Sequence, residues 1–436
     1  MLSAVRSALT TPDLRKKILF TLAIVAVYRL GANVPSPGVS YPNIQECVRQ
    51  VEGGDNASVY SLINLFSGGA LLQLSIFALG IMPYITSSII IQLLQVVIPR
   101  FEQLKKEGQS GQSKLTQYTR YLTIGIAVLQ GTGFVALAER GQLFAGCSLP
   151  IIPESSVFTL VVIVLVMTAG TTVVMWLGEQ VTERGIGNGM SLLIFASIAH
   201  RIPAEGQQIL QNSGGLVFTG ICVFGLAIIA SVVFIENGQR RIPVQYAKRM
   251  VGRRMYGGTS TYLPLKVNQA GVVPVIFGSS LLYLPDLVAK LAGNDGGWFQ
   301  KFVATYLVDQ SNWVHILLYV ALIIFFTYFY VGITFNPDER ADDMKKYGGF
   351  IPGIRPGRPT AEYLNYVLSR ITLPGSLYLG IIAVLPNFFL GVTGGGGNQN
   401  FPFGGTAVLI MVSVGLDTLK QIESQLMQRN YEGFLR

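Results

Sequence analysis

The chain has 436 residues, a mean hydropathy of +0.48 and 50% hydrophobic residues, while only 13% of its residues are charged. Because soluble domains have about a quarter of their residues charged, this composition excludes an ordinary soluble protein. The apolar residues form long uncharged blocks, and about 18 of them in a helix cross the ~30 Å hydrocarbon core. The sequence therefore predicts an all-α membrane protein that crosses the bilayer repeatedly.

Charged residues delimit ten predicted spans. The first five are expected at about 18–34, 74–97, 121–138, 155–178 and 187–200. The other five are expected within 206–235, at 268–284, 312–335 and 371–391, and from about 403. Pro274, inside the seventh span, predicts a kink there.

One uncharged stretch is too long for a single span. It runs for 43 residues, from Ala57 to Pro99. Its Ser67–Gly69 segment leaves no room for two complete spans with a turn, so we expect a short re-entrant helix at Ser58–Phe66 before the second span. Such backbone is tolerated at membrane depth only beside protein or a water-filled cavity, which already suggests a pore.

The basic residues predict the orientation. With ten spans, 26 of the 32 lysine and arginine residues lie in the termini and the even-numbered loops. Because cytoplasmic loops are enriched in basic residues, both termini are expected in the cytoplasm.

Two predicted cytoplasmic loops, 236–267 and 336–370, are unusually long. Attraction to anionic lipid would explain their charge but not their length or their Gly/Pro-rich texture, so a protein partner is the better interpretation.

The chain also divides into two five-span halves, 1–213 and 214–436, which must have opposite orientations because five is odd. That arrangement is typical of an inverted repeat with a central site.

Enzymatic function is disfavoured by the motifs. HExxH, GxSxG and GxxxxGK are absent and there are only two histidines, so neither an intramembrane hydrolase nor a cofactor is expected. A secondary transporter with an inverted-repeat fold is the alternative, although the span interiors lack the charges that ion-coupled transporters use. Cys47 and Cys147 lie in two outer loops; the sequence permits a disulfide, but two free thiols are the more common arrangement.

Apolar and weakly polar side chains dominate the predicted mid-span positions. Isoleucines occur there at Ile81, Ile85, Ile194, Ile276 and Ile410. Spans two and seven also carry polar groups at Thr86, Ser87, Gln92, Ser279 and Ser280. Taken singly, these residues are explained by core packing and by hydrogen bonds between helices.

Several long motifs, taken together, resemble one known family. They are Phe66–Ala70, Ala78–Ile85, Lys105–Gly108, Trp176–Gln180, Thr182–Gly189, Leu263–Asn268 and Pro352–Gly357. In order and over nearly the whole chain, they resemble the SecY family, the channel subunits of the bacterial Sec protein translocase.

The resemblance implies a clamshell of two five-helix halves, with a pore between them and a lateral gate facing lipid. It implies that the five isoleucines form an apolar pore ring and that the polar residues of spans two and seven lie at the gate. It also implies a plug at Ser58–Ala70. The plug residues are Ser58, Tyr60, Leu62, Asn64, Phe66, Gly68 and Gly69.

The same resemblance implies the function and the partners. The function would be passage of unfolded preproteins across the bacterial plasma membrane, with lateral release of apolar segments into membrane lipid. Arg253, Arg254 and Arg355 would contact the SecA motor or the ribosome. SecE and SecG would be the membrane subunits.

Overall fold

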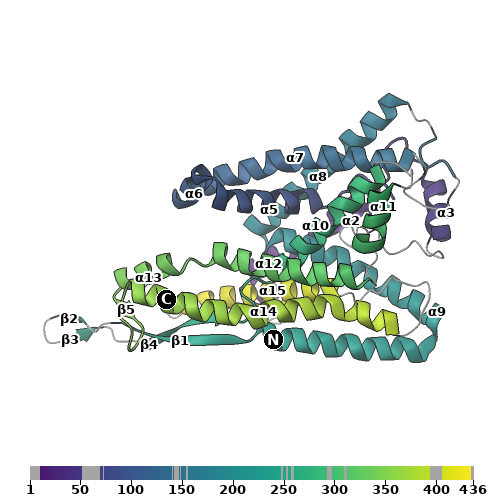
Figure 1. The fold of residues 1–436 in the computed structure, drawn as a ribbon. Coiled ribbons are helices and arrows are strands. Elements are labelled where there is room, and N and C mark those ends of the chain that lie inside the picture. Colours follow the sequence, from purple (N-terminus) through teal and green to yellow (C-terminus); the bar gives the residue numbers. More distant parts are fainter. Residues whose placement is uncertain are drawn as a thin grey trace.

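The computed structural model describes residues 10–51, 69–71, 73–139, 141, 147, 149–153, 156–246, 249–251, 254–256, 260–291, 297–308, 312–392 and 405–433. Figure 1 shows two groups of helices, α5 to α8 in one and α9, α12, α14 and α15 in the other. The strands β1 to β5 and the short helix α13 lie at one end of the molecule, and α3 and α11 lie at the opposite end.

The first half of the chain contributes long helices joined by shorter ones. The long helices are α2 (Pro12–Ala32), α5 (Met82–Val97), α7 (Gln109–Glu139), α8 (Val157–Arg184) and the first part of α9 (Gly189–Glu236). The short helices are α3 (Tyr41–Val51) and α6 (Pro99–Lys106).

The second half follows the same plan. Its long helices are the second part of α9, α10 (Val273–Leu291), α12 (Trp313–Thr334), α14 (Arg358–Val392) and α15 (Gly405–Gly433). Its short elements are α11 (Trp298–Phe302), the π-helix η1 (Val303–Val308) and α13 (Pro337–Lys346).

Asparagine side chains set the starts of three helices. The Oδ1 atom of Asn312 accepts a hydrogen bond from the amide of Val314 at 3.0 Å, and Asn188 and Asn336 begin α9 and α13 in the same way. An asparagine at this position satisfies an amide that the first helical turn leaves unpaired. α12 therefore begins and ends within one residue of the predicted eighth span.

Among the described residues, five helices are long and apolar enough to cross a membrane. They are Gln109–Glu139, Val157–Arg184, Gly214–Glu236, Trp313–Lys346 and Arg358–Leu385. α5 and α6 together form a further candidate, bent by 100° where Pro99 begins α6. Each of the ten predicted spans overlaps a helix of the structure, and their number stays a prediction.

Two details of the predicted spans are wrong. The second span was expected from residue 74, but α5 begins only at Met82, and the described residues from 73 to 81 form turns and a bridge between Pro35 and Ser75. Pro274 is the second residue of α10 and not an interior residue, so it removes no helical hydrogen bond and predicts no kink. Pro285 is the proline inside that helix.

The two long loops that the sequence predicts in the cytoplasm contain strands that the sequence analysis did not predict. β1 (Gln239–Tyr246) pairs antiparallel with β4 (Ser260–Lys266), and β5 (Gly349–Phe350) adds to the other edge of β1. β2 (Arg249–Val251) and β3 (Arg254–Tyr256) form a separate hairpin. Because β5 belongs to the second long loop, the two loops share one sheet.

The helix α9 is interrupted at Gly214, whose backbone has φ 81° and ψ 165°. This is a conformation that a residue with a Cβ atom rarely adopts, so glycine suits the position. The break lies one residue after the predicted end of the first half, a division that stays a prediction.

A disulfide joins Cys47 of α3 to Cys147, with a Cα–Cα distance of 5.4 Å. The expectation that two free thiols are more common is therefore wrong here. Next to it, the side-chain amide of Asn43 donates to the carbonyl oxygen of Pro150 at 2.8 Å. Cys47 is fully buried in an outer cluster that also contains Ile44, Leu71 and Leu74.

We expect the Cys47→Ser variant to melt at a lower temperature than the wild type. The bond closes a loop with a sequence separation of 100 residues, and a disulfide of this kind contributes about 2–4 kcal/mol. Thermal unfolding in detergent measures the effect, and Cys222→Ser is the matched control because Cys222 is a free thiol. Alkylation of all three cysteines without a reductant would contradict the bond.

Candidate functional site

The five mid-span isoleucines lie in one apolar cluster at the centre of the structure. Ile81, Ile194 and Ile410 are buried, with exposed fractions of 1–3%, and Ile85 and Ile276 are partly buried against them. The structure therefore brings together residues from four helical segments that are far apart in the sequence.

Local structure explains how each isoleucine reaches the centre. Ile81 ends the turns before α5, and the amide of Ile85 donates to its carbonyl oxygen at 3.1 Å, which starts the helix. Ile276 lies in the first turn of α10, where its amide donates to the carbonyl oxygen of Val272 at 3.3 Å. Ile194 and Ile410 lie in α9 and α15.

The chemistry of this cluster is uniform. An isoleucine side chain has no hydrogen-bond donor or acceptor, so the five isoleucines of this cluster offer water no partner. Among the described residues, no group of three or more histidine, cysteine, aspartate or glutamate side chains could hold a metal ion. The arrangement suits a barrier to water and ions better than a binding site for a small polar ligand.

An apolar seam lies beside the isoleucines, where α5 meets α10 and α12. Its members are Ile85, Ile89, Leu93, Val273, Phe277, Leu322, Phe326 and Tyr330. The rings of Phe277 and Phe326 meet edge to face at 5.5 Å, and Phe277 and Tyr330 do so at 6.3 Å. These edge-to-face pairs join α10 to α12 and add to the burial of apolar area, whereas α5 contributes aliphatic side chains to the seam.

The polar residues predicted at the gate do not hold this seam together. Thr86 and Ser87 donate to the carbonyl oxygens of Met82 and Pro83, and Ser279 donates to that of Ile276. Gln92 donates to Ser88 at 3.4 Å, again within its own helix. The hydroxyl of Ser280 is buried without a partner. The expectation of hydrogen bonds between helices is therefore wrong for the four residues whose bonds are described.

The sequence analysis missed the apolar members of the seam. A signal was present, because Ile85, Ile89 and Leu93 recur at every fourth residue, as do Leu322, Phe326 and Tyr330. This spacing puts each set on one face of its helix. Which helix each face meets is a matter of the tertiary structure.

The predicted plug falls almost entirely outside the described residues. Ser58, Tyr60, Leu62, Asn64, Phe66 and Gly68 are not described, whereas Gly69 and Ala70 are. Ala70 is fully buried, and its carbonyl oxygen accepts a hydrogen bond from the amide of Ser75 at 3.1 Å. Further along the connection into α5, Leu71, Leu74 and Ala78 belong to the cluster that contains Cys47.

Two of the three predicted partner-contact residues, Arg254 and Arg355, lie at the end of the molecule that carries the strands. Arg355 is exposed in the turn between β5 and α14, where the hydroxyl of Thr360 donates to its carbonyl oxygen at 2.9 Å. Arg254 lies in β3, although its side chain is outside the described part, and Arg253 is not described. β1 and β5 place the turn with Arg355 beside the β1–β4 ribbon.

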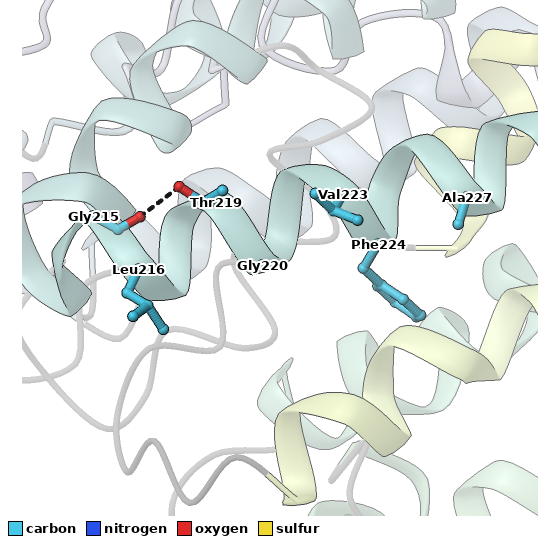
Figure 2. A pocket seen from close by; sticks show the side chains of 7 residues that line it. All are labelled: Gly215, Leu216, Thr219, Gly220, Val223, Phe224 and Ala227. Atoms are coloured by element: carbon cyan, nitrogen blue, oxygen red, sulfur yellow. Dashed lines mark hydrogen bonds between the residues drawn. The ribbon is translucent and has the colours of Figure 1, made fainter.

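The second part of α9 presents an apolar groove along its outer face, which Figure 2 shows at close range. Gly215 and Gly220 leave space between larger side chains such as Leu216 and Val223, and Thr219 turns its hydroxyl back to the carbonyl oxygen of Gly215 at 2.8 Å. Leu216 is 89% exposed. A leucine side chain this exposed is favourable only where lipid or another apolar surface covers it.

Comparison with known proteins identifies the family to which this architecture belongs. The SecY family model matches residues 75–419. The chain belongs to the SecY family. It is 71% identical to the protein translocase subunit SecY of Mycobacterium tuberculosis (strain H37Rv) and 62% identical to that of Streptomyces coelicolor, each over the full length of both chains.

Solved structures show the SecY-type fold as well. A protein-conducting channel matches with a TM-score of 0.66 and 19% identity, covering 94% of this chain and 91% of the other. The Sec61 channel from a canine ribosome–channel complex matches with a TM-score of 0.62 and 18% identity over the same shares. The predicted class, a helical membrane protein with this channel fold, is confirmed.

We expect Phe277→Ala to destabilise the seam. Removing a buried phenylalanine from a packed core costs about 3–5 kcal/mol, because its apolar contacts are lost and a cavity remains. Phe325→Ala is the matched control, since Phe325 is on the neighbouring helix but 60% exposed. Thermal unfolding in detergent should show a clear loss for the first variant and little change for the second. Equal losses would contradict the assignment of Phe277 to a tightly packed seam.

Proposed function

We propose that this SecY-family chain is the central pore-forming subunit of a protein-conducting channel. It passes unfolded polypeptides across the bacterial plasma membrane and releases apolar segments laterally into lipid. The observation that carries this proposal is the gathering of Ile81, Ile85, Ile194, Ile276 and Ile410 into one apolar cluster between the helices of the two halves.

An apolar ring suits a substrate of any sequence. A passing chain presents every kind of side chain, so strong or directional contacts would trap some segments. Branched aliphatic side chains make weak contacts with all of them and can change rotamer as the chain moves. When no chain is present, the ring disfavours a continuous file of water and so resists ion flow.

The seam between α5, α10 and α12 supports lateral release. Its contacts are apolar and aromatic, so helices that separate there meet lipid tails without leaving hydrogen bonds unsatisfied. An apolar segment in the pore that reaches lipid gains about 0.8 kcal/mol for each buried CH₂ group. This balance would favour the exit of hydrophobic segments and the retention of polar ones.

The connection into α5 and the break in α9 support two further assignments. We assign the plug to Ser58–Ala70, because its described end, Ala70, is buried beside the outer cluster and leads to Ile81. We assign the hinge between the halves 1–213 and 214–436 to the helix break at Gly214. A single glycine can absorb a rotation that a continuous helix would resist.

Two observations support cytoplasmic termini. The strands and α13 lie at one end, and the disulfide-bonded α3 lies at the other (Figure 1). Disulfides persist in oxidising compartments, so the α3 end is assigned to the outside. The excess of basic residues in the termini and the even-numbered loops agrees with placing these parts of the chain in the cytoplasm.

The partners follow from the same orientation. The relatives are subunits of a protein translocase, so the chain is assigned to a translocation complex. We assign SecE and SecG as its membrane subunits, and SecA or the ribosome as the cytoplasmic partner that contacts Arg253, Arg254 and Arg355. An exposed arginine at the tip of a shaped turn can form paired hydrogen bonds with acidic or phosphate groups.

Replacing Ile85 and Ile276 together with asparagine should make the resting channel conduct ions while protein transport continues. Asparagine offers donors and acceptors at the constriction, so a water file becomes favourable. Single-channel recording of the purified complex measures the conductance, and Leu165→Asn, at a 60% exposed position of α8, is the control for a polar change elsewhere. A folded double variant with wild-type conductance would overturn the pore-ring assignment.

Arg355→Glu should strongly reduce transport driven by the cytoplasmic partner without lowering the amount of folded channel. The reversed charge would repel the acidic groups that the arginine attracts. Transport into vesicles by the added motor ATPase measures the effect. Arg358→Glu, three residues away on α14 and also exposed, is the control for a general effect of charge. Near-normal transport by Arg355→Glu would reject the contact.

A further inference from the structure

A buried carboxylate lies at the cytoplasmic edge of the helices. Glu236, the last residue of α9, is 7% exposed and is the only buried carboxylate among the side chains that the structure describes. Its Oε1 atom accepts hydrogen bonds from Nδ2 of Asn268 at 2.6 Å and from Oγ of Ser413 at 3.1 Å. Burying such a group is costly without partners, so these bonds hold it in place.

This carboxylate closes the base of the β1–β4 ribbon. Glu236 precedes β1 by three residues, and Asn268 follows β4 by two. Between them, the amide of Gly238 donates to the carbonyl oxygen of Ile235 at 2.9 Å, and the amide of Val267 donates to that of Gly238 at 3.0 Å. The two strands therefore leave the helices from a single hydrogen-bonded point.

The same asparagine also holds the start of α10. Nδ2 of Asn268 donates a second hydrogen bond, to the carbonyl oxygen of Gly271 at 3.1 Å, in the turn that leads to Val273. Ile276 and Phe277, which belong to the central cluster and the seam, follow within five residues. The side-chain amide of Asn268 thus links the ribbon and α9 to α10, the helix that contributes to both the central cluster and the seam.

The base of the β1–β4 ribbon is packed closely against α14 and α15. A methyl group added at Gly375 of α14 would overlap the carbonyl oxygen of Val267, so the two backbones are in direct contact. Ser413 comes from α15, and Asp417 of the same helix forms an exposed ion pair with Lys266 at 3.5 Å. The base of the ribbon is therefore fixed to α14 and α15 as well as to Asn268.

We propose that Glu236 is a positioning residue that couples the β1–β4 ribbon to α10 through Asn268. A partner that docks on the ribbon would shift Asn268, and the shift would reach Ile276 and Phe277 at the start of α10. This inference rests on the proposed function, because it needs a partner that binds the cytoplasmic strands. What it adds is the residue that carries the movement from the ribbon to the seam.

Three variants separate this role from simple stability. Glu236→Ala removes the acceptor of both hydrogen bonds and should uncouple the ribbon from α10. Glu236→Gln keeps an acceptor, and its new amide can donate to Oδ1 of Asn268, which is buried without a partner; it should remain coupled. Asp417→Ala is the matched control, because it breaks the exposed pair between the same β4 and α15 elements.

The first measurement needs no partner. Spin labels on Tyr262→Cys in β4 and Leu281→Cys in α10 report the distance between ribbon and helix, in a Cys222→Ser background so that the remaining cysteines are in the disulfide. We expect a narrow distribution of the label-to-label distance in the labelled protein with Glu236 intact, and also after Glu236→Gln or Asp417→Ala. Glu236→Ala should at least double its width. A folded Glu236→Ala with an unchanged distribution would overturn the proposal.

The second measurement adds the motor ATPase to vesicles that contain the purified complex. Glu236→Ala should bind the motor within about twofold of wild type but transport protein at least tenfold more slowly, and Glu236→Gln should restore transport. Equal loss of folded protein, motor binding and transport would show a structural role and overturn the proposal. If the wild type itself does not transport, the proposed function fails, while the distance measurement still decides whether the ribbon and α10 are coupled.

Discussion

Packing among branched apolar side chains at the centre of the molecule is the constraint on which the other features depend. The five isoleucines come from four helical segments in both halves of the chain, so the halves meet where water finds no hydrogen-bond partner. Such contacts are weak individually and not directional. In the proposed channel they would close the resting pore and still yield to a chain of any sequence, which a polar or charged constriction would not do.

Polar groups are used where the molecule has to hold a shape. At the end that carries α3, the Cys47–Cys147 bond and the amide of Asn43 hold this helix against the loop that precedes α8. At the end that carries the strands, Glu236 and Asn268 hold the ribbon on the helices. On the seam helices α5 and α10, by contrast, the hydroxyls of Thr86, Ser87 and Ser279 are satisfied within their own helices, and the seam itself is apolar. Rigid ends and a yielding centre are consistent with a channel that opens between its halves.

Several features were predictable because their cause is local. The eighth span was predicted within one residue of α12, since Asn312 and the polar residues after Thr334 bound an uninterrupted apolar run. The start of α5 was not, because the residues before Met82 are equally apolar and form turns around a bridge to Pro35. The ribbon was missed although Ile242 and Val244 alternate with exposed residues in β1, a period of two that a search for spans overlooks. Among the site residues, the isoleucines were grouped through a family resemblance, whereas Phe277, Phe326 and Glu236 were not singled out.

By itself, the sequence determined that the chain lies in a membrane, where most of its spans lie and which loops carry the basic charge. These properties depend on the cost of placing charge in hydrocarbon and on the thickness of the bilayer, and each acts on one segment at a time. The tertiary structure alone decided that Cys47 meets Cys147, that α5 packs on α10 and α12, and that Glu236 receives Asn268 and Ser413. Each of these contacts joins residues that are distant in the chain, so no local pattern of hydrophobicity or charge specifies it.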